Sequence, residues 1–410
     1  GFGRTGTVDW ITTPKTATFT AVNGEGYFIN SGSAITANLP AGSAGAIVAF
    51  SDYARNFATY NLTISPNGSE KIGGLAQNAS LDVDGQAATF VYVDATKGWV
   101  NVQNAEDTET GLTPFLTATG GTITEDGDYK VHTFTGPGTF TVTNVAPGPS
   151  GNPNNADYLV LAGGGGGGSD GYPAPRGGGG GGAGGYRLSA CTYSEPAGRA
   201  NPSGALPLSV QGYSIIVGAG GAGGPPSSCA PVANGVRGGV STFSTITSAG
   251  GGAGNGHGAS TNGDMTVTPG GSGGGFQGEG TPTPAHPVGG KGNTPPTSPV
   301  QGFNAGDAAG SPNYNYGGGG GAGGRGANSP PTGSGGAGGV GSPSAITGSA
   351  VNYGGGGGSS PSGGASPCGT GGAALGYDGT VNRGGGGAGN RPGTGGSGGS
   401  GIVIIRYKFQ

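Results

Sequence analysis

Apolar and polar residues alternate in short stretches over the first quarter of the chain, which is the pattern of β-strands. Turn dipeptides such as Asn23-Gly24, Asn67-Gly68 and Asp84-Gly85 lie between these stretches, as they do in β-hairpins. Residues 9–104 are therefore predicted to form an all-β module that follows an N-terminal extension at 1–8. The predicted strands are Thr18 to Val22, Gly26 to Ile29, Ala46 to Phe50, Asn61 to Ile64, Ala88 to Val93 and Gly98 to Val102.

A polar and charged segment at 105–113 is predicted to be a linker. Alternation resumes in residues 114–162, around the turn signals Glu125-Asp126-Gly127 and Gly136-Pro137-Gly138. We expect hairpins here that open the next part of the chain. Their predicted strands are Phe115 to Ala118, Gly121 to Thr124, Asp128 to Phe134 and Gly138 to Val142.

From Tyr158 onward a unit recurs in which a strand-like apolar piece is followed at once by a run of glycines. Examples are YLVLAGGGGGG at 158–168 and YSIIVGAGGAGG at 213–224. Segments rich in Pro, Ser, Asn and Thr separate the runs and have the composition of loops. The chain closes with the apolar block Ile402 to Ile405, which predicts a terminal strand.

Glycine is the residue that sets this second part apart, because 84 of the 105 glycines follow residue 162. Collagen is excluded, since the runs lack a Gly-X-Y period. A flexible coil is the simple alternative. We favour packed polyproline-II-type helices, in which every N–H and C=O points outward to a neighbouring helix and close approach leaves no room for a Cβ. Residues 163–410 are thus predicted to be a polyglycine-II sandwich with variable loops, flanked by β-strands, with essentially no α-helix.

Charge differs between the two parts: residues 1–162 hold 14 acids and 6 bases, and residues 163–410 hold 6 acids and 10 bases. The bases form no cluster, which argues against nucleic-acid binding. No apolar run approaches the length needed to span a bilayer. The three cysteines match no CxxC spacing, and a bridge between Cys191 and Cys229 stays open beside three separate thiols.

Catalytic chemistry is not expected from this sequence. Two G-x-S-x-G patterns, at 270–274 and 395–399, follow from glycine abundance alone, and the second precedes a strand rather than a helix. His132, His257 and His286 are isolated, so we expect no metal site. We therefore expect no enzyme activity, no catalytic residues and no cofactor.

Aromatic residues in the loop segments are the remaining candidates for function. Each can pack onto the glycine runs as a cap, or it can form part of a contact surface, because rigid scaffolds commonly display binding residues on loops. One histidine lies among them. The candidate receptor-binding residues are Tyr172, Tyr193, Phe276, His286, Phe303, Tyr314 and Tyr377.

Several stretches resemble known families. The run SGSAITANLPAGSAGAIVAFSDYARNFATYNLTISPNG at 31–68, with FVYVDATKGWVNV at 90–102, resembles a β module in tail-fibre and other virion proteins of marine tailed bacteriophages, notably cyanophages. DYKVHTFTGPGTFTV, DYLVLAGGGGGG and the terminal GGSGIVIIRY resemble the glycine-rich domain of phage tail proteins and related bacterial proteins. In T-even-like phages a similar adhesin forms a sandwich of polyglycine-II helices whose distal loops recognise the host.

The resemblance implies a non-enzymatic tail-fibre adhesin on the surface of a virion. Its expected partners are a host cell-surface receptor, either a glycan or an outer-membrane protein, and other virion proteins, with a homotrimer formed at the N-terminal module. The alternative is a capsid decoration or extracellular fibre protein that uses the glycine-rich part as a rigid spacer. An ice-binding protein is a third interpretation, against which the long loops argue. We expect neither nucleic-acid binding nor membrane insertion.

Overall fold

The computed structural model describes residues 8–103, 115–145, 154–169, 177–196, 203–226, 234–256, 268–276, 289–308, 315–330, 334–361, 363–364, 366–372 and 375–409. Within these ranges the regular secondary structure is all β-strand with no helix, so the all-β prediction is confirmed there. None of the described segments is a helix long and apolar enough to cross a membrane. The chain divides into two compact units, the first holding residues 1–114 and 147–149 and the second holding 115–146 and 150–410.

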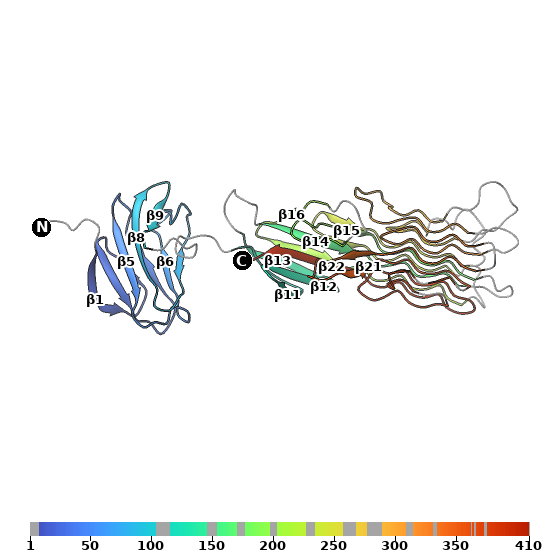
Figure 1. The fold of residues 1–410 in the computed structure, drawn as a ribbon, viewed down its shortest axis with the longest axis horizontal. Coiled ribbons are helices and arrows are strands. Elements are labelled where there is room, and N and C mark those ends of the chain that lie inside the picture. Colours follow the sequence, from blue (N-terminus) through green and yellow to red (C-terminus); the bar gives the residue numbers. More distant parts are fainter. Residues whose placement is uncertain are drawn as a thin grey trace. The chain divides into compact units, whose positions relative to one another are not determined.

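The first unit is built from two sheets that enclose one apolar core (Figure 1). Its largest fully buried side chains are Tyr27, Phe50, Phe57, Phe90 and Trp99. One sheet has the order β1 (Asp9–Lys15), β3 (Glu25–Ile29), β5 (Ile47–Asp52), β8 (Ala87–Asp94), β9 (Gly98–Asn101). The other has the order β2 (Phe19–Thr20), β4 (Ile35–Asn38), β6 (Leu62–Ser65), β7 (Ala79–Leu81).

Parallel pairing of alternate strands corrects the hairpins that the sequence predicted in this unit. β1, β3 and β5 pair in parallel in one sheet, and β2, β4 and β6 do so in the other. The turn at Asn23-Gly24 is present, with Gly24 at a φ of 89°, but it carries the chain from β2 in one sheet to β3 in the other. A tight turn reverses the chain in either arrangement, so the dipeptide alone does not say which strand becomes the partner.

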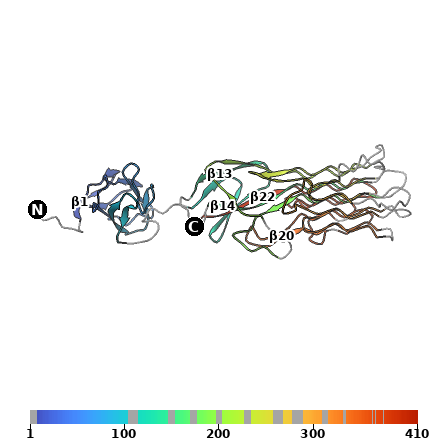
Figure 2. The same ribbon diagram turned by 90° about the horizontal axis from the view of Figure 1, so that it is seen from above.

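The second unit begins with a sandwich of two sheets (Figures 1 and 2). One sheet has the order β10 (Thr117–Thr119), β13 (Gly138–Asn144), β17 (Gly212–Ile216), β18 (Ser241–Phe243), β19 (Ile246–Ser248). The other has the order β11 (Thr122–Asp126), β12 (Tyr129–Phe134), β22 (Ile402–Lys408), β14 (Asn155–Leu161), β15 (Tyr186–Leu188), with β16 (Leu206–Pro207) also on β14. A separate antiparallel pair joins β20 (Ser342–Ser344) and β21 (Val351–Tyr353).

Strand β22 confirms the predicted terminal strand and lies at the centre of its sheet, antiparallel to both β12 and β14. Its side chains alternate between two apolar clusters: Val403 and Ile405 face the sandwich core, while Ile402 and Ile404 face a cluster on the other side. A strand that is buried on both faces needs a continuous apolar run rather than an alternating one. This double burial explains the block GIVIIRY.

The predicted hairpin around Glu125-Asp126-Gly127 is confirmed, because β11 and β12 pair in antiparallel register across it. The second predicted hairpin, around Gly136-Pro137-Gly138, is wrong. There the chain passes from one sheet of the sandwich to the other, so that β12 pairs with β22 while β13 pairs with β10 and β17. The turn residues mark a change of direction, and the partners come from segments far along the chain.

The glycine runs between residues 163 and 401, which we call the glycine layer, lie side by side and extend away from the sandwich (Figures 1 and 2). Residues 163–168 show how they are joined. Their amides donate, in a repeat of three residues, to three antiparallel runs: the acceptors are Gly239, Gly399, Gly182, Val236, Gly396 and Gly179 in chain order of the donors. Their carbonyls accept from three parallel runs, through the amides of Gly251, Gly221, Gly387, Gly254, Gly224 and Asn390.

Three residues per turn is the period of a polyproline-II-type helix. A run that bonds three neighbours through its amides and three through its carbonyls has six neighbours, as a rod does in hexagonal packing. Each N–H and C=O of residues 163–168 thereby has a partner, although none lies within the run itself. The backbone polar groups of this buried segment are satisfied only by the assembled layer.

The runs approach so closely that many inner positions accept only glycine, although small side chains such as Ala183 and Ala253 are buried at others. A Cβ added at Gly181 would overlap the carbonyl oxygen of Gly165, and one added at Gly319 would overlap that of Gly181. Both overlaps involve backbone on each side, so no side-chain rotation relieves them. By contrast, a Cβ at Gly136, in the turn between β12 and β13, meets nothing within 4 Å.

We expect Gly181→Ala to lower the free energy of unfolding of the second unit by about 3 kcal/mol or more, because the extra methyl must separate two hydrogen-bonded backbones. Gly136→Ala is the matched control and should change it by less than about 1 kcal/mol. Both tryptophans, Trp10 and Trp99, lie in the first unit. Denaturant unfolding followed by tryptophan fluorescence should therefore be unchanged, while the transition seen by tyrosine fluorescence shifts. Equal effects of the two variants would contradict tight packing at Gly181.

The sandwich core contains a buried histidine whose pKa is shifted. His132 on β12 is fully buried, with Nδ1 2.7 Å from the carbonyl oxygen of Gly120 and Nε2 3.2 Å from the hydroxyl of Tyr407. Its ring centroid lies 5.0 Å from that of Phe140. Burial lowers the pKa of His132 below its usual value of 6.5; the Gly120 carbonyl opposes this shift and the charge of Lys130 adds to it.

The lowered pKa predicts that acid destabilises the second unit. Below about pH 6.5 the unfolded chain binds a proton at this histidine more readily than the folded chain does. The free energy of unfolding therefore falls as the pH drops through this range and is fully retained above it. We expect His132→Gln to weaken this dependence between pH 7.5 and 5.0, measured by denaturant titrations at each pH. An identical slope in wild type and variant would rule out His132 as its source.

Candidate functional site

The end of the glycine layer remote from the sandwich is the first candidate site, and hydrogen bonds place the ends of several runs there at one level. Gly168 donates to Gly179, Gly179 to Asn255 and Asn255 to Gly275, with distances of 2.8 to 3.0 Å. Asn390 donates to Gly168 in turn, at 3.1 Å. Backbone hydrogen bonds thus hold the ends of these runs next to one another, and we call this end of the layer the distal end.

Among the described residues, Leu375 and Tyr377 are large apolar side chains that are exposed at the distal end. Leu375 is 60% exposed and Tyr377 is 64% exposed. The backbone beneath them is fixed, because Gly376 donates to Gly389 at 3.2 Å and Ala388 donates to the Tyr377 carbonyl at 2.9 Å. An exposed apolar pair on a rigid backbone has the character of a contact surface. Tyr377 is a residue that the sequence predicted; Leu375 was missed, although its place in the loop segment ALGYDG was a signal.

Two other predicted aromatics lie within the glycine layer with little exposed surface. Phe276 is at the distal end and only 9% exposed, as expected of a side chain that caps the runs. Phe303 is partly buried, and its carbonyl accepts from Gly273 at 3.0 Å while its amide donates to Gly321 at 3.2 Å. The structure does not bring these two together with Tyr377.

Tyr193 lies beside the sandwich rather than at the distal end. Its hydroxyl donates to the carbonyl of Ser189 at 3.0 Å, and its ring centroid lies 5.6 Å from the guanidinium carbon of Arg406. Burial, and then the charge of Glu195, raise the pKa of Tyr193 above its usual range. Its contacts with β22 and the segment after β15 are those of a packing residue.

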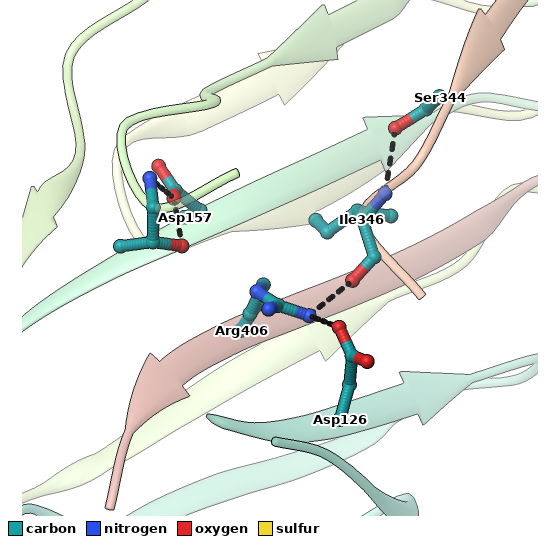
Figure 3. A network of polar contacts seen from close by, with 6 residues as sticks. Asp126, Asp157, Ser344, Ile346 and Arg406 are labelled. Carbon is teal, nitrogen blue, oxygen red and sulfur yellow. Dashed lines mark hydrogen bonds and ion pairs between the residues drawn. The ribbon is translucent and has the colours of Figure 1, made fainter. Parts of the chain in front are cut away.

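Arg406, on β22, lies at the centre of a network of polar contacts beside the sandwich (Figure 3). It is 4% exposed, and its guanidinium donates to Asp126 at 2.7 Å and to the carbonyl of Ile346 at 3.3 Å. Its guanidinium carbon also lies 4.3 Å from the ring centroid of Tyr129. One arginine thereby ties the terminal strand to β11 and to the connection between β20 and β21.

Asp157, the register partner of Arg406 on β14, is buried and engaged by the segment that follows β15 (Figure 3). It accepts from the amides of Cys191 at 2.8 Å and Thr192 at 2.7 Å, and from the hydroxyls of Ser189 and Thr192. These four donors satisfy the hydrogen-bonding capacity of a carboxylate that is closed off from water. These contacts give the region a structural role.

Reactive groups are dispersed over the rest of the described residues. Within them, no group of three or more His, Cys, Asp or Glu side chains is arranged to hold a metal ion. Ser272, the centre of one G-x-S-x-G pattern, is buried between runs and its amide donates to Ala183 at 3.0 Å. Cys191 and Cys368 are free thiols. Cys229 lies outside the described residues, as do Tyr172, His286 and Tyr314.

Comparison with known proteins gives one family. Residues 133–408 match the glycine-rich domain family. The match begins in β12, takes in the whole glycine layer and ends with the last residue of β22. No curated protein sequence matches the chain. Because the family match covers more than half of the 410 residues, the chain belongs to the glycine-rich domain family.

Proposed function

We propose that the protein is a non-enzymatic tail-fibre adhesin on the surface of a virion, and that it recognises the host cell through the distal end of its glycine layer. The observation that carries this proposal is the exposure of Leu375 and Tyr377 on a backbone held by inter-run hydrogen bonds. A rigid scaffold lowers the entropy cost of binding, and aromatic side chains supply large contact area. The resemblance of the sequence to phage tail proteins supports the same role.

The partners follow from this role: a glycan or outer-membrane protein on the host cell, and other proteins of the virion. Capsid decoration, or an extracellular fibre with the glycine layer as a spacer, is the alternative. In that case the distal end contacts neighbouring copies instead of a cell.

An adhesin should bind intact cells of its host saturably. We expect the fluorescently labelled full chain to bind some bacterial strains and not others, and Leu375→Ser with Tyr377→Ser to weaken this binding at least about tenfold. Tyr60→Ser, which alters a 38% exposed tyrosine in the first unit, is the control and should bind as wild type does.

Binding that survives the double variant would remove the distal end from the proposal. An intact wild-type protein that binds no strain, its own host included, would favour the structural alternative. Circular dichroism of each labelled sample separates loss of binding from loss of fold.

Self-association is proposed at the first unit, where an aromatic row crosses the outer face of β1, β3 and the end of β5. Trp10 stacks on Phe28 at 4.9 Å between ring centroids, and Phe28 lies 6.4 Å from Tyr53. Trp10 is 42% exposed and Tyr53 is 61% exposed. An apolar row of this kind suits burial against other copies, and trimers are common among the fibres that the chain resembles.

We expect the full chain to sediment as a trimer, and Trp10→Ser with Tyr53→Ser to shift it toward the monomer. Val236→Ser, at a 55% exposed valine of the glycine layer, is the control and should leave the assembly unchanged. Sedimentation equilibrium over a range of concentrations measures both. A monomeric wild-type chain would refute the trimer.

A further inference from the structure

A cleft at the sandwich end of the glycine layer is a second candidate site, separate from the distal end. Its volume is about 330 Å³, and it is bordered by β12, β21, β22 and the segment 381–383. β12 and β22 are paired there, with Thr133 opposite Ile404. Strands distant in sequence therefore form one wall, and the turn at 381–383, which precedes a glycine run, forms the other.

The walls combine apolar and hydroxyl-bearing side chains. Val351, Val381, Ile402 and Ile404 make up the apolar lining. Ile402 and Ile404 are only 7% and 1% exposed, because they belong to the cluster on the outer face of the sheet, whereas Val381 is 68% exposed. The hydroxyls come from Thr133, Thr135 and Thr347. A sugar ring has the same two characters, because its C–H groups form an apolar face and its hydroxyls lie around the edge.

Arg383 gives the cleft a positive charge. Its guanidinium carbon lies 4.9 Å from the ring centroid of Tyr353, so a planar fork of donors is stacked on an aromatic face. The ion pairs among the described residues join other partners and do not include Arg383. The neighbouring acids are engaged elsewhere: Glu195 accepts from Ser344 at 2.6 Å and Ala345 at 3.1 Å, and Asp126 pairs with Arg406.

The backbone that carries Arg383 is held in place. Asn382 has a φ of 57°, its amide donates to the Ser400 hydroxyl at 2.9 Å, and that hydroxyl donates to the Asn382 side chain at 3.0 Å. The Arg383 carbonyl accepts from Gly354 at 2.7 Å. Because the backbone at Arg383 is already ordered, binding an anion there costs little conformational entropy. The guanidinium favours groups that accept two parallel hydrogen bonds.

We propose that this cleft binds an acidic sugar residue, with its carboxylate or sulfate ester on Arg383, its hydroxyls on the threonines and its apolar face against Val351 and Val381. The site lies at the opposite end of the glycine layer from Leu375 and Tyr377, and the proposal does not rest on the adhesin role. Galacturonate, galactose 6-sulfate and galactose are suitable probes, since they share a ring and differ in charge.

Isothermal titration of the full chain with each probe tests the site. We expect galacturonate or galactose 6-sulfate to bind at least about tenfold more tightly than galactose, and Arg383→Gln to abolish that difference. The arm that binds more tightly tells a carboxylate from a sulfate ester. Arg391→Gln, at an arginine of a distal turn, is the matched control and should keep the difference. Equal binding of all three probes by wild type would overturn the proposal.

Arg383→Gln also loses the contact with the ring of Tyr353, which can lower the stability of the fold. A second variant therefore leaves Arg383 in place and fills the cleft instead. Val381 lines it and is 68% exposed, whereas Val340, 40% exposed, does not line it. We expect Val381→Phe to weaken binding of the acidic sugar at least about tenfold and Val340→Phe to leave it unchanged, with both unfolding as wild type does. Undiminished binding by Val381→Phe would place the sugar elsewhere and refute the site. Host-cell binding by Leu375→Ser with Tyr377→Ser tests the distal end separately.

Discussion

Hydrogen bonding between glycine backbones at close approach is the interaction on which the second unit depends. Residues 163–168 have bonds to six neighbouring runs and none within their own run. A Cβ at Gly181 or Gly319 would overlap a facing carbonyl oxygen. Ordering each residue costs on the order of 1–2 kcal/mol, and one run makes none of these bonds alone. The layer therefore forms only as a whole, with many runs in place at once.

Apolar burial comes from the sandwich, which supplies what glycine lacks. β14 and β22 are buried on both faces, and the clusters that they join include residues of β12, β15 and β21. The glycine runs begin and end at these strands, so the sheet sets the positions of the first and last runs. Arg406 and Asp157 secure the same region with polar contacts. The side-chain core and the backbone-bonded layer are thus parts of one unit.

This construction decides where side chains can act. Inner positions such as Gly181 and Gly319 exclude side chains, and others hold only small buried ones such as Ser272, so contact with a partner is confined to the ends and edges of the runs. Leu375 and Tyr377 are displayed at the distal end, whereas Arg383 lies where a run returns to the sandwich. A cell-surface contact and an acidic-sugar site can coexist on such a scaffold, because the layer between them holds both ends without taking part in either.

The sequence by itself located the glycine runs and most of the strands, because apolar alternation, turn dipeptides and glycine density are local properties. It missed β1, β4 and β7 in the first unit and β16 and β20 in the second. It predicted the terminal strand from Ile402 to Ile405 and the hairpin at Glu125-Asp126-Gly127, and it singled out Tyr377. Strand partners were decided only by the tertiary structure, since Asn23-Gly24 and Gly136-Pro137-Gly138 turn the chain without saying which sheet it enters. The cleft could not be predicted from the sequence for the same reason. Its lining residues are far apart along the chain, and only the pairing of β12 with β22 and the return of a glycine run bring together Thr133, Val351, Arg383 and Ile402.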